Sequence, residues 1–155
     1  HISGSQEAFA ELMNTEAKQL GATGTHFVNP HGLHDENHYT TTYDLYLMFN
    51  EALKDQAFLD IISMNSYTAK VTSADGTSYT PTWQATNYYS AGEATPPDGI
   101  HVYGGKTGTT DQAGNCVILY EKNTAGEPYI SVIMGASDKP LLYEEMNELL
   151  DAGMK

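Results

Sequence analysis

The residues with the clearest chemical use are Lys106, Thr107 and Gly108, within a run of glycines and threonines over residues 104–110. A lysine supplies positive potential, a threonine hydroxyl can donate a hydrogen bond to a carboxylate, and a glycine lets a ligand approach the backbone. Acyl transfer to a serine needs an activated nucleophile, N–H donors for the oxyanion, and a substrate anchor. The run can supply the last two, so it predicts one wall of an acyl-transfer site. A lone Lys-Thr-Gly also occurs by chance in exposed turns, so the rest of the sequence must show whether this one belongs to an active site.

The composition indicates one acidic globular domain. The chain has 155 residues, of which 40% are hydrophobic and 17% charged, enough for a single domain with a buried core. Its formal net charge of −13 argues against nucleic acid and anionic lipid as partners. All seven basic residues are lysines, so these residues cannot supply a guanidinium clamp for a carboxylate. Cys116 is the only cysteine and is expected to be a buried strand thiol.

The first 65 residues are expected to be mainly helical, with helices over residues 6–20, 42–53 and 56–62. Hydroxyls in residues 3–5 can cap the first helix, and Gly21 is a natural stop. Thr41 followed by Asp44 is typical of a capping box for the second. The first helix is expected to bury an apolar face made of Phe9, Leu12, Met13, Ala17 and Leu20.

The rest of the chain predicts strands and a closing helix. Strands are expected over residues 66–72, 77–82, 102–107, 117–121 and 129–134. Asp75-Gly76 is a good turn for the first pair, and residues 84–100 are expected to be irregular. Pro140 suits the first turn of a helix with an apolar stripe of Leu142, Met146, Leu149 and Leu150. Helices, then a meander, then a packed helix indicate an α+β fold with an antiparallel sheet.

A polar loop over residues 22–42 offers an alternative, metal-binding function. It contains His26, His31, His34 and His38, together with Asp35 and Glu36, and such side chains could ligate zinc. The spacing contains no His-x-x-x-His helical pair. The competing interpretation is that His31 belongs to a structural turn and that the others are solvated. The main interpretation requires no metal and no cofactor.

Several segments resemble one family, the serine-type D-alanyl-D-alanine carboxypeptidases or low-molecular-mass penicillin-binding proteins. The similar segments are residues 9–14 with Leu20-Gly21, residues 25–33, 38–45, 105–110 with Ala113-Gly114, and 130–135. They stand in the family's order over nearly the whole chain, and the Asn-Pro-His-Gly-Leu stretch at residues 29–33 is quite specific. The resemblance implies part of the β-lactamase and penicillin-binding transpeptidase fold.

The resemblance also implies an activity and a set of roles. The family hydrolyses the terminal D-Ala-D-Ala bond of peptidoglycan stem peptides through an acyl-serine and is acylated by β-lactams. By analogy, Lys106 and Thr107 would bind the terminal carboxylate, and the backbone N–H of Thr109 would be one oxyanion donor. Gly108 would keep the strand open to substrate. The expected location is the outer face of the cytoplasmic membrane or the cell envelope.

The family's nucleophile motif, Ser-x-x-Lys, is not found. The nearest match runs from Thr15 to Lys18 with threonine in place of serine, and Ser63-Met64-Asn65 fits a Ser-x-Asn motif only out of the family's order. The chain has no initial methionine, as expected for a fragment or processed product. Residues 1–155 are therefore expected to be one partial domain, roughly the C-terminal half of the catalytic domain. Residues 1–65 would be its mainly helical part, and residues 66–155 would carry the strands, the motif and the closing helix.

The missing N-terminal half would then be a partner, and the chain alone is expected to be inactive and to expose a sheet edge. Many relatives carry an arginine near the start of the last helix, where this chain has Lys139. Either Lys139 replaces it as a point charge, or the carboxylate is held by Lys106, Thr107 and Thr109. A non-catalytic fragment that binds peptidoglycan peptides is the other alternative. Trp83 and the tyrosines would also suit carbohydrate binding, but half-buried packing is expected for Tyr39, Tyr43, Tyr46, Tyr88 and Tyr89.

Overall fold

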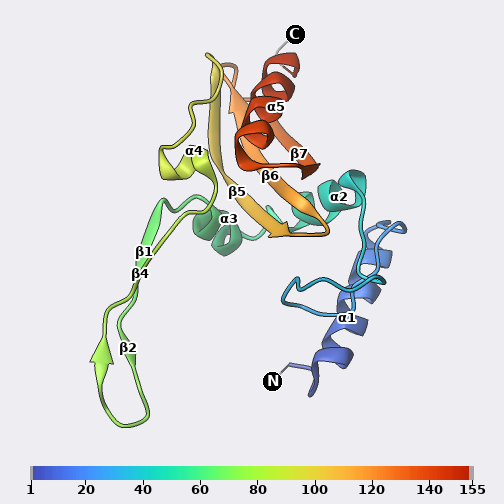
Figure 1. Cartoon of the computed structure of the whole chain (residues 1–155), viewed down its shortest axis with the longest axis vertical. Helices are drawn as coiled ribbons and strands as arrows, with labels where there is room; N and C mark the ends of the chain where they lie inside the picture. The colour runs from blue at the N-terminus through green and yellow to red at the C-terminus, as the bar shows by residue number, and fades with distance from the viewer. Residues whose placement is uncertain (1, 154–155) are drawn as a thin grey trace.

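Helices come first in the chain, and strands with two further helices follow (Figure 1). The structure is a computed structural model that describes residues 2–153, so residues 1, 154 and 155 of the expected domain lie outside the described residues. The helices are α1 (Gln6–Gln19), α2 (Thr42–Ala52), α3 (Gln56–Ile62), α4 (Tyr88–Ala91) and α5 (Lys139–Ala152). The strands are β1 (Ser66–Thr68), β2 (Val71–Thr72), β3 (Ser78–Tyr79), β4 (Thr82–Gln84), β5 (Ile100–Thr110), β6 (Gly114–Asn123) and β7 (Pro128–Ala136). The expected α+β class is confirmed.

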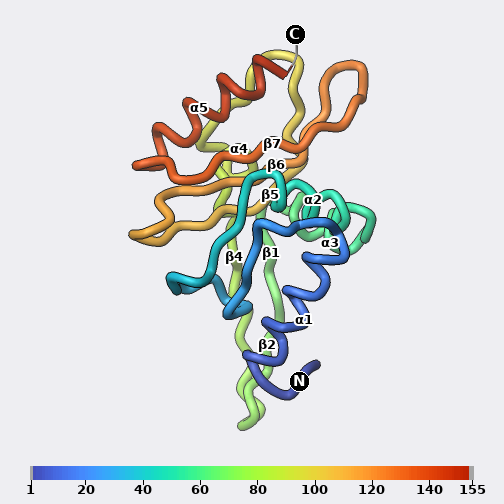
Figure 2. Tube along the Cα trace, turned by 90° about the vertical axis from the view of Figure 1, so that its right-hand side faces the viewer, coloured from blue at the N-terminus to red at the C-terminus, as the bar shows by residue number. Residues whose placement is uncertain are grey.

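The main sheet is antiparallel and has the strand order β5-β6-β7. Helix α5 covers one face, and α2 and α3 lie on the other, as the edge-on view in Figure 2 shows. The central strand β6 is therefore buried from both sides. Val117 and Leu119 pack in the core beneath α5, while the intervening Ile118 points to the opposite face and is also buried.

The core lies between the sheet and α5. It consists of Val117, Leu119, Ala136, Leu142, Tyr143, Met146 and Leu150. Helix α5 is capped by Asp138, whose side chain accepts a hydrogen bond from the Leu141 N–H at 2.9 Å, and Pro140 lies in the first turn as expected. Three residues of the expected apolar stripe lie in this core. The fourth, Leu149, is exposed, and Tyr143 is buried in addition.

A long hairpin over residues 66–84 projects away from the sheet and its helices (Figure 1). It was expected as one continuous pair, but it consists of two short ladders, β1 with β4 and β2 with β3. The pairing is interrupted near Pro81: its carbonyl accepts a hydrogen bond from the Ala69 N–H at 3.1 Å, but proline has no N–H to return. The turn at Asp75-Gly76 is confirmed, with Gly76 at a φ of +88°.

Helix α1 begins at the N-cap Ser5 and is held to the following loop by Asn14. The Asn14 side chain donates a hydrogen bond to the Phe27 carbonyl at 2.8 Å and accepts one from the Phe27 N–H at 2.7 Å. The expected apolar face is only partly buried. Ala17 is covered, but Leu12 is 50% exposed and borders an open groove of about 620 Å³. The prediction is wrong at Leu12 because no element within residues 2–153 packs over that part of α1.

Three further differences from the expectations are local. The segment expected to be irregular contains the one-turn helix α4, which is capped by Asn87 at its start and by Gly92, with a φ of +77°, at its end. Cys116 is half-buried rather than buried. Tyr39, Tyr43 and Tyr46 are exposed rather than half-buried, whereas Tyr88 and Tyr89 pack against Tyr143 as expected for packing residues. No helix within residues 2–153 combines the length and apolar character needed to cross a membrane.

Candidate active site

Strand β5 carries Lys106, Thr107 and Gly108 at an edge of the main sheet. Within the described residues, β6 is its only strand partner, so the backbone groups on its other side are free for a ligand. The motif itself is strand, whereas the sequence predicted a strand that ends at the motif. Because side chains alternate along a strand, Lys106 and Gly108 lie on one face and Thr107 and Thr109 on the other.

Three glycines shape this strand in different ways. A Cβ at Gly104 would lie 2.0 Å from the Ile62 carbonyl oxygen, and one at Gly105 would lie 2.1 Å from the Ile118 carbonyl oxygen. Both positions therefore require glycine, since α3 and β6 approach the backbone of β5 closely. A Cβ at Gly108 would meet no atom within 4 Å. The space beside Gly108 is thus open to a ligand.

Lys106 places an unpaired positive charge at this edge. Its side chain is exposed, and its ammonium donates a hydrogen bond to the Thr107 carbonyl oxygen. The one ion pair within residues 2–153 joins Lys54 to Glu51, so no carboxylate of this part of the chain neutralises Lys106. In a chain with a net charge of −13, this ammonium is a local point of attraction for an anionic group.

The hydroxyl of Thr107 is held by a neighbour that the sequence did not reveal. The Thr86 and Thr107 hydroxyl oxygens are 2.7 Å apart. Thr86 directly precedes Asn87, the residue that caps α4. Helix α4 is fixed to α5, because the Tyr88 N–H donates to the Tyr143 hydroxyl at 2.9 Å and the two rings stack with centroids 4.4 Å apart. Asn87 is buried. The Thr-Asn pair before a short helix was an available N-cap signal.

Thr109 contacts a second residue that sequence reasoning missed. The Thr109 hydroxyl donates a hydrogen bond to Asn115 Oδ1 at 3.2 Å, and the buried Asn115 donates through Nδ2 to the Ala136 carbonyl at 3.3 Å. Asn115 therefore links β5 to the end of β7 across β6. The Thr109 side chain is therefore already engaged within the chain.

Lys139 is exposed and lies near this assembly. Its ammonium is 5.5 Å from the centroid of the Tyr88 ring, a cation–π distance. Tyr88 is two residues after Thr86, so Lys139 belongs to the same side of the site as the Thr86–Thr107 contact. Its charge contributes to the positive potential there, but the structure places it against an aromatic ring.

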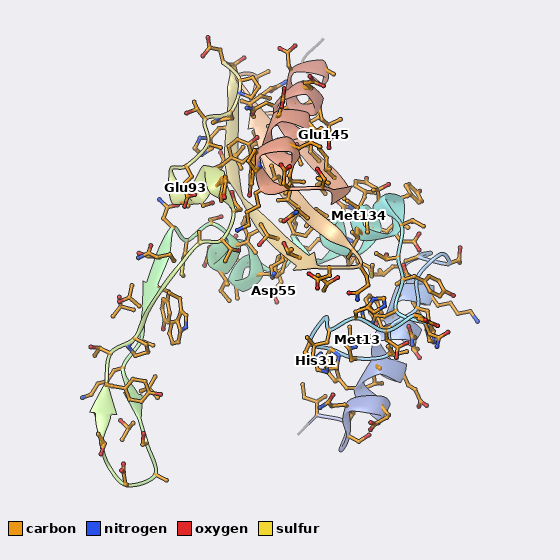
Figure 3. All side chains as sticks on the ribbon, in the orientation of Figure 1. Met13, His31, Asp55, Glu93, Met134 and Glu145 are labelled. Atoms are coloured by element: carbon orange, nitrogen blue, oxygen red, sulfur yellow. The ribbon has the colours of Figure 1, made fainter. Side chains whose placement is uncertain are left out.

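Three of the four histidines of residues 22–42 make hydrogen bonds within this loop, and His34 is exposed. His26 Nδ1 is 2.6 Å from the Asn37 carbonyl oxygen, and His31 Nδ1 accepts a hydrogen bond from the Leu33 N–H at 3.2 Å. Burial lowers the pKa of His38, whose Nδ1 accepts a hydrogen bond from the Val28 N–H. Figure 3 shows His31 on the loop beside α1, apart from the sheet. No three potential metal ligands gather within residues 2–153, so the geometry gives the zinc alternative no support.

The serine of the out-of-order Ser-x-Asn match is engaged within its own helix. The Ser63 hydroxyl donates to the Leu59 carbonyl at 2.8 Å. The lysine ammonium groups with hydrogen bonds in the described residues, Lys54 and Lys106, donate to a carboxylate and a carbonyl, not to a serine. The arrangement on β5 can therefore anchor a carboxylate and offer backbone donors. It includes no serine with a lysine beside it.

Comparisons with known proteins identify the family of the chain. The sequence pattern of the family described as D-alanyl-D-alanine carboxypeptidase matches residues 1–138. The chain is 30% identical over 150 residues to the D-alanyl-D-alanine carboxypeptidase DacF of Bacillus subtilis, covering 97% of this chain and 36% of DacF. It is 30% identical over 155 residues to DacA of Haemophilus influenzae, covering 99% of this chain and 36% of that protein. The chain thus spans about a third of the length of these curated relatives.

Solved structures show the same fold. The crystal structure of a Streptomyces DD-transpeptidase superposes with a TM-score of 0.84 at 26% identity, over 95% of this chain and 54% of that one. A D-alanyl-D-alanine carboxypeptidase from Mycobacterium tuberculosis superposes with a TM-score of 0.80 at 24% identity, over 99% of this chain and 56% of that one. The helices and antiparallel sheet therefore match part of a penicillin-binding transpeptidase fold, as expected from the sequence.

Proposed function

Because the chain belongs to the D-alanyl-D-alanine carboxypeptidase family, we propose that it forms one wall of the active site of a serine D-Ala-D-Ala carboxypeptidase. Its substrate would be a peptidoglycan stem peptide that ends in D-Ala-D-Ala, and β-lactams would occupy the same site. The chain would supply part of one catalytic domain. The rest of the domain, including the nucleophile, would come from residues that are not in this chain.

One observation carries the proposal. The edge of β5 that pairs with no strand of the described residues combines the ammonium of Lys106, the oriented hydroxyl of Thr107 and the open space beside Gly108. Lys106 has no carboxylate partner in the described residues, Thr107 is oriented by Thr86, and a Cβ at Gly108 would meet no atom within 4 Å. A peptide could lie along this edge as an added strand, with its terminal carboxylate at Lys106 and Thr107.

The chemistry follows from these positions. A serine oxygen attacks the carbonyl carbon of the penultimate D-Ala, and the carbonyl oxygen becomes an oxyanion that accepts hydrogen bonds from the Thr109 N–H and the serine's own N–H. The C–N bond then breaks, the proton released by the serine hydroxyl is passed to the leaving nitrogen, the terminal D-Ala departs as the amine, and an acyl-serine remains. Water hydrolyses this ester. A β-lactam would form the same ester by opening its ring, so its leaving amine would stay attached.

Two consequences concern the chain itself. Without a serine nucleophile it would be inactive alone, and it would bind the peptide only weakly. Since the substrate is a cell-wall polymer, the protein would work at the outer face of the cytoplasmic membrane or in the cell envelope.

Intact-mass measurement after incubation with benzylpenicillin tests the proposal. We expect no adduct on the chain alone and one penicilloyl adduct on a polypeptide that also carries the family's Ser-x-x-Lys segment. The Lys106→Ala variant of that polypeptide should acylate more slowly, whereas Lys70→Ala, which removes an exposed lysine of the hairpin, should not.

The outcomes of this measurement separate the alternatives. An adduct on the chain alone would place the nucleophile within these residues and contradict that part of the proposal. No adduct on either polypeptide, with retained binding of a D-Ala-D-Ala peptide, would favour a non-catalytic binding protein. Equal acylation of the Lys106→Ala variant would remove Lys106 from the site.

A further inference from the structure

Asn115 fixes the direction of a short chain of hydrogen bonds that ends on β5. It lies on the central strand, opposite Thr109 of β5 and opposite Ala136 of β7 (Figure 1). The residue is only 9% exposed. Asn115 Nδ2 donates to the Ala136 carbonyl oxygen at 3.3 Å, and Asn115 Oδ1 is 3.2 Å from the Thr109 hydroxyl oxygen. Both polar atoms of this buried amide are thus engaged.

The donors and acceptors of this chain have one favourable arrangement. A carbonyl oxygen can only accept, so the amide nitrogen of Asn115 must face Ala136. The amide oxygen then faces Thr109, and because it also can only accept, the Thr109 hydroxyl supplies the proton. The reversed amide would set two buried acceptors, Asn115 Oδ1 and the Ala136 carbonyl, against each other, which is costly. The Thr109 proton therefore points toward β6.

This arrangement decides what the Thr109 hydroxyl can offer to a ligand. A hydroxyl has one proton, so the exposed Thr109 side chain can only accept a further hydrogen bond. An ionised carboxylate has no proton to give and would face oxygen lone pairs there. Turning the Thr109 proton toward the carboxylate would leave the buried Asn115 Oδ1 without a partner, which carries the penalty of an unsatisfied polar group. The Thr109 hydroxyl is therefore unsuited to bind a carboxylate.

Thr107, two residues earlier on the same face of β5, has a freedom that Thr109 lacks. Its hydroxyl oxygen is 2.7 Å from the Thr86 hydroxyl oxygen, and either member of such a pair can be the donor. When Thr86 donates, the Thr107 proton remains available for a carboxylate. The ammonium of Lys106 lies at the Thr107 backbone and adds a positive charge. Two threonines of one strand thus differ in the groups that they can bind.

The difference matters because it sets where a peptide lies along β5. Two residues of a strand span about 7 Å. A carboxylate that moved from Thr107 to Thr109 would shift the peptide by that length and carry the penultimate carbonyl away from the Thr109 N–H, its proposed oxyanion donor. We propose that Asn115 is a specificity-determining residue, which makes the Thr109 hydroxyl an acceptor and so confines the peptide carboxylate to Lys106 and Thr107. This inference rests on the function proposed above.

A pair of peptides tests it, N-acetyl-D-Ala-D-Ala and the same peptide with a C-terminal amide, each titrated into the chain by NMR. The measured quantity is the preference, the affinity for the carboxylate peptide divided by that for the amide. Thr107→Val should lower the preference about fivefold, because a hydrogen bond to a charged group is about twice as strong as a neutral one. Thr109→Val should leave the preference unchanged, whatever it does to both affinities.

The role of Asn115 appears in a second background. Asn115→Leu keeps a similar volume and frees the Thr109 proton, so in this variant the addition of Thr109→Val should lower the preference by a similar factor. Thr124→Val, which removes an exposed hydroxyl in the turn after β6, is the matched control and should lower it in neither background. An unchanged preference on adding Thr109→Val to Asn115→Leu would overturn the inference. Equal effects of Thr107→Val and Thr109→Val in the otherwise wild-type chain would overturn it without any change at Asn115.

Urea unfolding of these variants tests the contact without a peptide. Thr109→Val and Asn115→Leu remove the same hydrogen bond, so the double variant should lose less stability than the two single losses added together. Additive losses would overturn the inference whatever the peptides do. Non-additive losses in a chain that binds neither peptide, or both equally, would instead overturn the proposed carboxylate site, and the role of Asn115 with it.

Discussion

Glu121 is a buried acid whose charge should control the stability of the fold. It is 1% exposed on β6, where Oε1 accepts a hydrogen bond from the Ser131 hydroxyl at 2.6 Å and the buried Oε2 has no partner in the described part of the chain. A space of about 20 Å³ lined by Glu121, Tyr129 and Leu150 lies beside it, enough for about one water molecule. Burial raises the pKa of Glu121 from 4.5 to about 7, against a smaller lowering by the Ser131 hydrogen bond.

The sign and size of the effect follow from proton linkage. Between the two pKa values the folded chain holds a proton on Glu121 that the unfolded chain has released, so stability falls as pH rises. The contribution is fully present below pH 4.5 and is lost through pH 7. At about 1.4 kcal/mol per pKa unit, the total loss is about 3 kcal/mol. Such a loss is a large share of the stability of a typical domain.

Urea unfolding of the wild type and of Glu121→Gln, followed by circular dichroism, measures this effect. Glutamine keeps the Ser131 hydrogen bond and stays neutral, so its amide adds only an offset that does not depend on pH. We expect the stability difference between variant and wild type to shift by about 3 kcal/mol in favour of the variant between about pH 4.5 and about pH 8. Glu148→Gln, on the exposed face of α5, should show no such shift. A difference that is the same at both pH values would refute the reasoning.

Further predictions concern the site and its support. Gly104→Ala should lower the free energy of unfolding by about 1–3 kcal/mol or more in urea titrations, because its Cβ would meet the Ile62 carbonyl. Gly108→Val, by contrast, should weaken D-Ala-D-Ala peptide binding in NMR titrations without a comparable loss of stability. Thr86→Val should weaken the same binding and Thr86→Ser should restore it, since only the hydroxyl contacts Thr107; equal binding by both would show that Thr86 does not orient Thr107. Tyr143→Phe should cost about 1–3 kcal/mol in thermal or urea unfolding, because the Tyr88 N–H loses its acceptor, and unchanged stability would contradict that account.

The sequence predicted those parts of the fold whose signals are local. The cap at Ser5, the turn at Asp75-Gly76 and the helix start at Pro140 all use side chains within a few residues of the backbone that they shape. These elements were confirmed for that reason. The exposed Leu12 shows the limit of predicting burial from the sequence. Helical spacing indicates which residues share a face, but not whether another element packs on that face.

The support of the site could not be predicted in the same way. Thr86 and Thr107 are 21 residues apart, and Tyr88 and Tyr143 are 55 apart. Nothing in the local sequence of either partner indicates the other, since a hydroxyl pair or a stacked ring pair requires the tertiary arrangement. The motif on β5 was found from residue types alone. Its roles at Lys106, Thr107, Gly108 and Thr109 stay predictions until the binding experiments are done.

The contacts around Thr107 imply that the closing helix influences the proposed carboxylate site. Tyr143 lies in the core on the sheet-covering helix α5, accepts the Tyr88 N–H and stacks on the Tyr88 ring. That contact fixes the start of α4, and Thr86 just before it reaches the Thr107 hydroxyl. The orientation of one proposed substrate-binding group is therefore set by the same core that holds the helix to the sheet. A change that loosens α5 should weaken peptide binding at Thr107 even when β5 itself is unaltered.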